Sequence, residues 1–374
     1  MAEDSIPVVV IGVGGVGAPT LQGCCRSDVV RVVGISDKDP EVASQAGRQA
    51  DVPFYTDNRR LLAETHPRAA FIAAPPMAAP DLIGACAERG IHVWKQLPLA
   101  RDLTEGLALV SRMEKAGLKF VIGTQRRFAY GYHNAAQLLE RVGQVFLARA
   151  HYLFNWGPSL KWRGDRASAG GGALMELGYH PIDLLVHMFG LPEEVYGQST
   201  GGRRPATGDD GAHPVYDTDD TAAAILRYAD GLMASVVTTR SSGPVSEELS
   251  LHGQTGSLRA DSESFLLRDP DGNVLDRGMA EGSPLETFRR QAEAFAAAVT
   301  SDAKCYECSA RENLLNLAVI EAIYLSGRTS QPETPLRLLH NVGLTAAECL
   351  STRPDPPQNE QAPPDEPSDV EEAN

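Results

Sequence analysis

The segment from residue 8 to residue 17 reads Val8-Val9-Val10-Ile11-Gly12-Val13-Gly14-Gly15-Val16-Gly17, an apolar run that leads into glycines spaced Gly-x-Gly-x-x-Gly. Such a run predicts a buried strand that turns directly into a helix. In this arrangement Gly12 permits the tight turn, Gly14 lets a pyrophosphate approach the backbone, and Gly17 allows close packing of helix on strand. Free N–H groups at the helix N-terminus favour the negative charge of a phosphate. The segment therefore predicts a dinucleotide-binding turn, whose backbone is completed by Val13, Gly15 and Val16.

Asp37 lies twenty residues after Gly17, at the end of the second strand-like run. A carboxylate at this place can accept hydrogen bonds from both hydroxyls of the adenosine ribose. The same carboxylate repels a 2′-phosphate, so the sequence favours NAD over NADP as the cofactor. Lys38, the next residue, keeps NADP open as the alternative.

Strand-like runs alternate with helix-length segments in the first third of the chain, at residues 8–11, 29–35, 69–73, 91–94 and 119–122. This alternation predicts a parallel sheet with helices on both faces. Beyond residue 145, strand-like stretches follow one another more directly, which predicts a largely antiparallel sheet. We therefore expect an α/β protein with three parts: a Rossmann domain (1–126), an α+β domain for substrate binding and oligomerisation (127–350), and a disordered, acidic, proline-rich tail (351–374).

The chain is acidic, because 34 Lys and Arg stand against 49 Asp and Glu, for a formal net charge of −15. This charge opposes binding to nucleic acid, so a small molecule is the expected partner. No apolar stretch reaches the roughly 18 residues that span a bilayer, and the first residues lack a basic segment. We therefore expect a cytoplasmic protein without membrane contact. The cysteines include one Cys-x-x-Cys, at Cys305 and Cys308, and without a second pair we assign no metal.

Three further segments make the pattern more specific. They are Phe71-Ile72-Ala73-Ala74-Pro75-Pro76, His92-Val93-Trp94-Lys95-Gln96-Leu97-Pro98-Leu99-Ala100 and Gly170-Gly171-Gly172-Ala173-Leu174-Met175-Glu176-Leu177-Gly178-Tyr179-His180-Pro181-Ile182-Asp183. From about residue 6 to about residue 335, the chain resembles the glucose-fructose oxidoreductase and inositol dehydrogenase family, also written Gfo/Idh/MocA. The resemblance implies an NAD(P)-dependent oxidoreductase that transfers hydride between nicotinamide and a hydroxyl of a sugar, cyclitol or related polyol. It also implies a homo-oligomer, dimeric or tetrameric, and a cofactor site that includes Ala74, Pro75, Gln96 and Pro98.

A predicted helix over residues 173–189 carries Glu176, His180 and Asp183 at positions i, i+4 and i+7, which share one helix face. His180 matches the catalytic histidine of the family. The pKa of a histidine lies near neutrality, which suits it to take a proton from a hydroxyl as hydride leaves the carbon. Glu176 stands where the family often has Asp, and it could orient His180 or bind a neighbouring substrate hydroxyl.

The main departure from the family lies at its Glu-Lys-Pro motif, which aligns with Gln96-Leu97-Pro98 and so lacks the lysine that assists proton transfer. Lys95 is two residues away and, on an extended segment, would point to the same side as Leu97. We therefore name Lys95 as a candidate catalytic substitute. Without any substitute, the loss of one acid–base group costs about 10² to 10⁴ in rate.

Aromatic and polar side chains near the predicted cleft offer the flat faces and donors that bind polyols. The glycines at 170–172 beside Trp162 and Arg163 also suggest a mobile substrate lid. Two alternatives stay open: an NAD-retaining glycoside hydrolase or lyase that works through transient oxidation, and a noncatalytic sensor of dinucleotide or sugar. The candidate substrate-binding residues are Arg127, Trp162, Arg163, Tyr179 and Asp183, with Tyr152 and Trp156 nearby.

Overall fold

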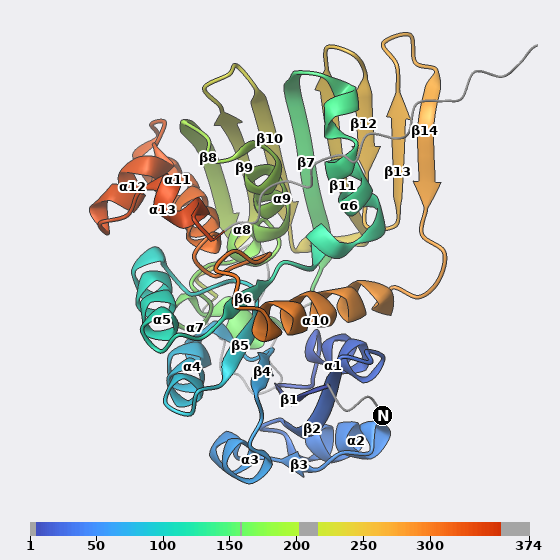
Figure 1. The fold of residues 1–374 in the computed structure, drawn as a ribbon. Coiled ribbons are helices and arrows are strands. Elements are labelled where there is room, and N and C mark those ends of the chain that lie inside the picture. The colour runs from blue at the N-terminus through green and yellow to red at the C-terminus, as the bar shows by residue number, and fades with distance from the viewer. Residues whose placement is uncertain (1–4, 158, 202–215, 353–374) are drawn as a thin grey trace, which may run out of the picture.

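Six parallel strands form the first sheet of the computed structural model, which describes residues 5–157, 159–201 and 216–352. The strand order is β3-β2-β1-β4-β5-β6, with β1 at the centre (Figure 1). This order confirms the predicted Rossmann sheet, and it brings the carboxyl ends of β1, β4 and β5 to one edge. The strands are β1 (Ile6–Ile11), β2 (Val30–Ser36), β3 (Phe54–Tyr55), β4 (Ala69–Ile72), β5 (His92–Gln96) and β6 (Phe120–Gly123).

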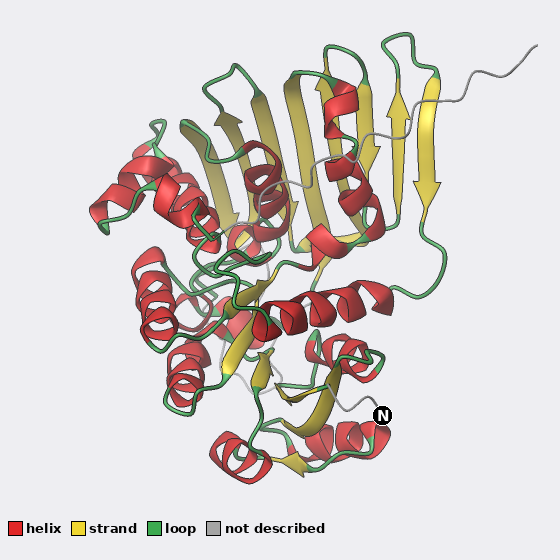
Figure 2. Cartoon of the chain, in the orientation of Figure 1, coloured by secondary structure: helices red, strands yellow, loops and turns green. Residues whose placement is uncertain are grey.

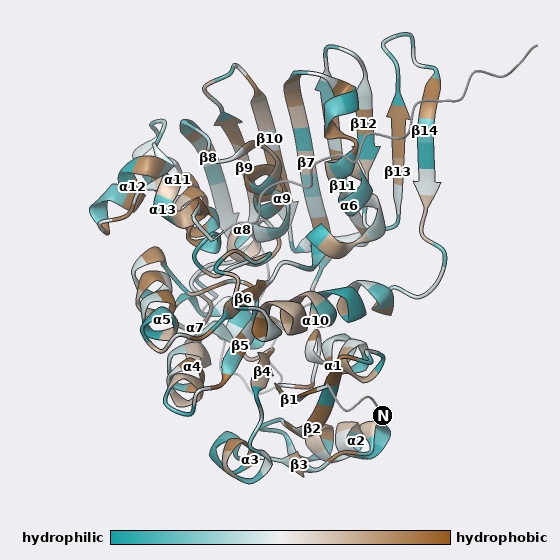
Figure 3. Ribbon diagram, in the orientation of Figure 1, coloured by the Kyte–Doolittle hydropathy of each residue, from teal (hydrophilic) through white to brown (hydrophobic). Residues whose placement is uncertain are grey.

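Helices cover both faces of the first sheet, because its central strands are apolar on both sides (Figure 3). One of these helices, α10 (Leu285–Thr300), comes from the far end of the chain and packs on α1. Its Phe295 meets Phe71 of β4 edge-on, with ring centroids 5.3 Å apart. The other helices that cover the two faces of this sheet are α1 (Gly17–Cys25), α2 (Pro40–Ala50), α3 (Asn58–Thr65), α4 (Ala79–Ala87) and α5 (Leu103–Lys115).

Eight strands form the second sheet, in the order β14-β13-β12-β11-β7-β10-β9-β8. The pair β7 and β10 is parallel and the other pairs are antiparallel, so the sheet is mixed but largely antiparallel, as predicted. Helices pack on one face of this sheet (Figure 2). The strands are β7 (Val145–Asn155), β8 (Glu194–Gly201), β9 (Asp219–Arg227), β10 (Met233–Thr239), β11 (Ser241–Gly253), β12 (Ser257–Ala260), β13 (Ser264–Arg268) and β14 (Val274–Met279).

The prediction of one helix over residues 173–189 is wrong, because α8 (Ala173–Glu176) and α9 (Tyr179–Phe189) are separated by a turn. Pro181 explains the break, since it has no N–H with which to bond the carbonyl of residue 177. Glu176 and His180 therefore lie on different helices. The remaining helices are α6 (Tyr130–Gln137), α7 (Arg166–Ala169), α11 (Asn313–Thr329), α12 (Pro335–Asn341) and α13 (Ala346–Leu350).

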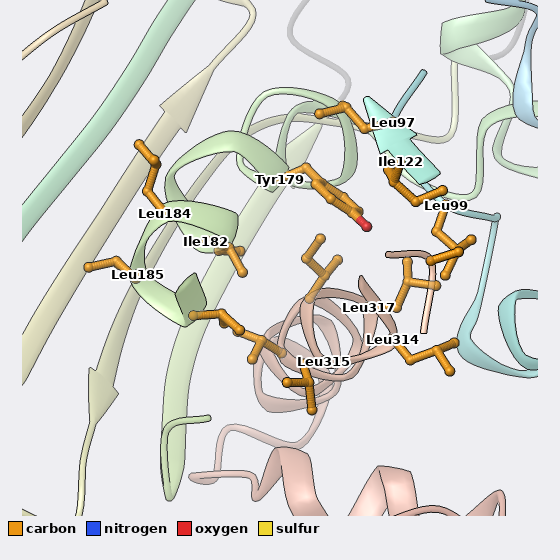
Figure 4. Packing of buried hydrophobic residues seen from close by; sticks show 14 of the residues in the cluster. Leu97, Leu99, Ile122, Tyr179, Ile182, Leu184, Leu185, Leu314, Leu315 and Leu317 are labelled. Atoms are coloured by element: carbon orange, nitrogen blue, oxygen red, sulfur yellow. The ribbon is translucent and has the colours of Figure 1, made fainter. Parts of the chain in front are cut away.

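A single apolar cluster joins the two sheets. Leu97 and Leu99, which follow β5, share this cluster with Tyr179 of α9 and Leu317 of α11 (Figure 4). The predicted boundary at residue 126 falls in a short 3-10 helix, Gln125–Phe128, and the predicted tail lies outside the described residues from 353 onward. In the part of the chain that is described, no helix has both the length and the apolar character needed to cross a bilayer.

Candidate active site

The glycine turn after β1 has the geometry that a dinucleotide needs. Gly12 has φ of +81°, and a Cβ there would lie 2.8 Å from the carbonyl oxygen of Ala73. A Cβ at Gly17 would lie 2.0 Å from the carbonyl oxygen of Gly12, so the helix could not approach the strand. A Cβ at Gly15 would meet nothing within 4 Å, which leaves open space beside the backbone N–H groups. These residues fit a bound pyrophosphate.

Asp37 lies against this turn at the end of β2, where the sequence places it. Its Oδ2 accepts hydrogen bonds from the N–H groups of Val13 (3.0 Å) and Gly14 (3.3 Å), and its Oδ1 accepts one from Asp39 (3.0 Å). A carboxylate has about four acceptor positions, so roughly one is left for a ribose hydroxyl. Hydrogen bonds to both ribose hydroxyls would require Asp37 to release one of the backbone groups.

The loops after β4 and β5 complete the edge of the first sheet above the turn. The Ala73 N–H donates to the carbonyl of Ile11, which places the following Ala74 and Pro75 beside Gly12. At the end of β5, the Gln96 side chain donates to that of Gln125 at 3.3 Å. The buried Oε1 of Gln96 has no hydrogen-bond partner among the described residues, so an acceptor is left for a ligand at this edge. Pro98, two residues on, is buried.

Lys95 does not reach this edge. Its side chain is 1% exposed, and its ammonium donates to the backbone carbonyls of Gln96 and Pro98. Burial lowers the pKa of Lys95 to about 7, although the nearby Glu105 opposes the shift. The structure thus contradicts the prediction that Lys95 replaces the family lysine, because β5 ends at Gln96 and the alternation of side chains does not continue to Leu97.

His180 lies in the first turn of α9 and is 7% exposed. Its buried Nδ1 has no hydrogen-bond partner among the described residues. The ring packs edge-on against Tyr152 of β7, with centroids 5.3 Å apart. Burial, together with the charge of Arg126, holds the pKa of His180 well below its usual range. The imidazole is therefore neutral at pH 7 and able to accept a proton.

Arg126 and Glu247 complete the surroundings of His180, and sequence reasoning missed both. Arg126 Nε lies 2.7 Å from Glu247 Oε2, and the guanidinium carbon lies 4.9 Å from the centre of the Tyr152 ring. Glu247 is opposite Tyr152 in the register of β11 and β7. The consecutive arginines at 126 and 127 were a signal in the sequence, but only the fold shows which of them faces His180.

Three of the predicted site residues, Glu176, Trp162 and Arg163, lie together. Arg163 Nε donates to Glu176 Oε1 at 2.6 Å. The guanidinium lies between two indole rings, 4.0 Å from the centre of Trp156 and 4.4 Å from that of Trp162. Burial raises the pKa of Glu176 even though Arg163 opposes the shift. This cluster supplies both a flat apolar surface and hydrogen-bonding groups.

Arg127, Tyr179 and Asp183 form a different, buried network. Arg127 donates to Asp183 at 2.6 and 2.8 Å and to Glu312, before α11, at 3.0 Å. Tyr179 donates to the side chain of Asn313 at 3.0 Å. The three predicted residues are 7%, 0% and 0% exposed. Their donors and acceptors already have partners, so the structure does not support the prediction that they contact substrate.

A Rossmann sheet with a glycine turn, joined to a second domain whose helix α9 carries a buried neutral histidine, defines a nicotinamide-dependent oxidoreductase. Two family models match the chain: "Oxidoreductase family, NAD-binding Rossmann fold" over residues 6–124 and "GFO/IDH/MocA C-terminal domain" over residues 132–259. The chain belongs to the Gfo/Idh/MocA family of NAD(P)-dependent oxidoreductases.

Named relatives and solved structures agree with this assignment. D-xylose 1-dehydrogenase (NADP(+)) 2 of Haloferax volcanii is 25% identical over 332 residues, which cover 86% of this chain and 97% of the relative. Levoglucosan dehydrogenase of Pseudarthrobacter phenanthrenivorans is 26% identical over 247 residues, which cover 60% of this chain and 63% of the relative. A structure of levoglucosan dehydrogenase with NADH and levoglucosan superposes with a TM-score of 0.80 at 20% identity, covering 88% of this chain and 99% of that one, which supports the fold.

Proposed function

We propose that this protein oxidises a hydroxyl of a sugar or related polyol, with His180 as the proton acceptor. The observation that carries the proposal is the buried imidazole of His180, which is neutral and has an unpartnered Nδ1 among the described residues. The relatives named for xylose and levoglucosan support a sugar as the substrate. Glu176, held by Arg163, is in place to bind a second hydroxyl and orient the ring.

The residues at the edge of the first sheet would hold NAD. The N–H group of Gly15 would bind the pyrophosphate, Asp37 the adenosine ribose, and Gln96 the nicotinamide half. The chemistry that bound NAD would supply is acceptance of the hydride from the carbinol carbon. His180 takes the proton of the same hydroxyl, so that the alcohol becomes a carbonyl compound. Leu97 packs in the apolar cluster that joins the two sheets and contributes no proton transfer.

We also propose that the protein is a homo-oligomer that assembles through the second sheet. Residues alternate along its strands between the core and the face that the helices leave uncovered. Large apolar side chains stand on that uncovered face, and a continuous patch of this kind needs a partner. The exposed apolar residues include Phe146, Tyr196, Ile225, Met233 and Val237.

A cytoplasmic location is part of the same proposal. All six cysteines of the chain are free thiols. Reduced cysteines are the rule in reducing compartments.

One experiment tests the reaction. The protein is purified without added cofactor and denatured, and any dinucleotide that it releases is identified. In parallel, NAD or NADP is added with a panel of sugars and polyols while the absorbance of reduced nicotinamide is followed. Reduction of added cofactor by one class of sugar supports the proposal. Retained NAD without net reduction favours glycoside cleavage through transient oxidation. The replacement of the family lysine by Leu97 is compatible with that reaction. Cofactor binding without any product indicates a sensor.

A further inference from the structure

Arg163 is held more rigidly than most surface arginines. Two indole rings, Trp156 and Trp162, enclose its guanidinium at 4.0 and 4.4 Å, and its Nε donates to Glu176. Its backbone carbonyl accepts a hydrogen bond of 3.1 Å from Arg240, a fully buried residue. The direction of the guanidinium is thus set before any ligand binds, which lowers the entropy cost of binding.

The guanidinium of Arg163 still has unused donors. A guanidinium carries five N–H groups, and Glu176 takes only the one on Nε. Neither terminal nitrogen of Arg163 forms a hydrogen bond within the described ranges, and the side chain is 22% exposed. Arg240, by contrast, is 0% exposed and donates from Nε and from both terminal nitrogens. Arg163 therefore presents a prepared donor fork that the described residues leave unsatisfied.

This fork lies beside the proposed reaction centre. Tyr152 packs on His180, and Trp156, four residues further along the chain, packs on Arg163. Trp156 follows the end of β7, and its ring packs edge-on against Phe154, two residues from Tyr152, with centroids 4.8 Å apart. Glu176, which precedes α9, is close to both Arg163 and Tyr152, since it bonds Arg163 and its charge contributes to the raised pKa of Tyr152. One small molecule can therefore place a hydroxyl at His180 and its other end at Arg163.

We propose that the substrate carries a carboxylate, as in a uronic or aldonic acid, and that Arg163 binds it through its two terminal nitrogens. The planar fork of a guanidinium matches the two oxygens of a carboxylate. A phosphate is disfavoured, because its second negative charge would lie near Glu176. The inference rests on the proposed function, whose substrate class it narrows.

The test compares matched sugars that differ only in the acid group. With NAD and the full-length protein, kcat/KM is measured for D-glucuronate against D-glucose, for D-galacturonate against D-galactose, and for D-glucose 6-phosphate. Binding of D-glucuronate is measured separately by calorimetry, without turnover. We expect the acids to be preferred at least tenfold, and Arg163→Met to lower the acid-to-neutral ratio of kcat/KM about 10- to 100-fold. Arg163→Lys, which keeps the charge but not the fork, should lower it less.

The matched control is Arg166→Met, which changes an exposed arginine at the start of α7, three residues further along the chain, whose guanidinium packs on Tyr324. It should leave the ratio unchanged. Equal turnover of acids and neutral sugars, faster turnover of the phosphate, or an equal loss for both sugars in Arg163→Met would overturn the inference while the oxidoreductase proposal stands. Arg163-dependent binding of glucuronate without reduced nicotinamide from any sugar would sustain the inference and refute the reaction. Thermal unfolding and NAD affinity show whether each variant is folded.

Discussion

Replacing Arg127 by methionine tests the buried network that joins the two sheets. Arg127 is the guanidinium that Asp183 and Glu312 share, and the three side chains are 5%, 1% and 1% exposed. Arg127→Met keeps most of the volume but leaves two buried carboxylates without their counter-ion. Breaking a buried ion pair from one side costs about 3 to 5 kcal/mol. We expect the free energy of unfolding to fall by at least this amount.

The matched control is Arg227→Met, which removes an arginine that also pairs with two carboxylates, Glu193 and Glu194. Here the arginine is 53% exposed and the acids 46% and 45%, so solvent screens both pairs and the expected loss is far smaller than for Arg127→Met. Urea denaturation followed by circular dichroism gives both values, provided that the slopes match that of the native protein. If the two variants lose equal free energy of unfolding, the buried network stabilises the fold no more than a surface ion pair does, and the reasoning is wrong.

The remaining predictions concern the cofactor and the reaction. Because the pKa of His180 is lowered, its neutral form persists below pH 6.5, so kcat/KM should hold at neutral pH and fall only at lower pH. Arg126→Met removes one cause of the lowered pKa of His180, so the pH below which kcat/KM falls should move upward. If that pH does not change, a group other than His180 controls it. Gly17→Ala places a Cβ 2.0 Å from a backbone oxygen of the turn and should weaken NAD binding by about tenfold or more in calorimetry. Gly90→Ala, at an open position of positive φ, is its control and should leave NAD affinity intact. Leu97→Lys restores the family's acid–base group and should raise kcat by about 10² or more. If kcat does not rise, another residue of this protein already performs the proton transfer of the missing lysine.

The dinucleotide site could be predicted from the sequence because its parts are local. A strand, a glycine turn and a helix follow one another between residues 6 and 25, and Asp37 is one strand further on. The chemistry of each residue is then decided by neighbours only a few positions away. The position of His180 was predictable for a similar reason, since the glycine-rich lead-in and the family pattern lie around it.

The errors arose where distant segments meet. Arg127 and Glu312 are 185 residues apart, and nothing near either residue indicates that they pair. The error at Lys95 is local instead, because β5 ends at Gln96 and the alternation of side chains stops there. Arg126 faces His180 only because β7 and β11 lie side by side, with Tyr152 opposite Glu247. Such long-range pairings depend on topology, which a pattern of residue types does not contain.

The return of α10 to the first sheet decides the order in which this chain can fold during synthesis. When residues 1–126 have left the ribosome, Phe71 still lacks the aromatic partner that Phe295 provides. The first domain is complete only after β14 has been made, because α10 follows that strand. A nascent chain must therefore protect this apolar surface of the first sheet until residues 285–300 have been made. An isolated N-terminal fragment would expose that surface permanently.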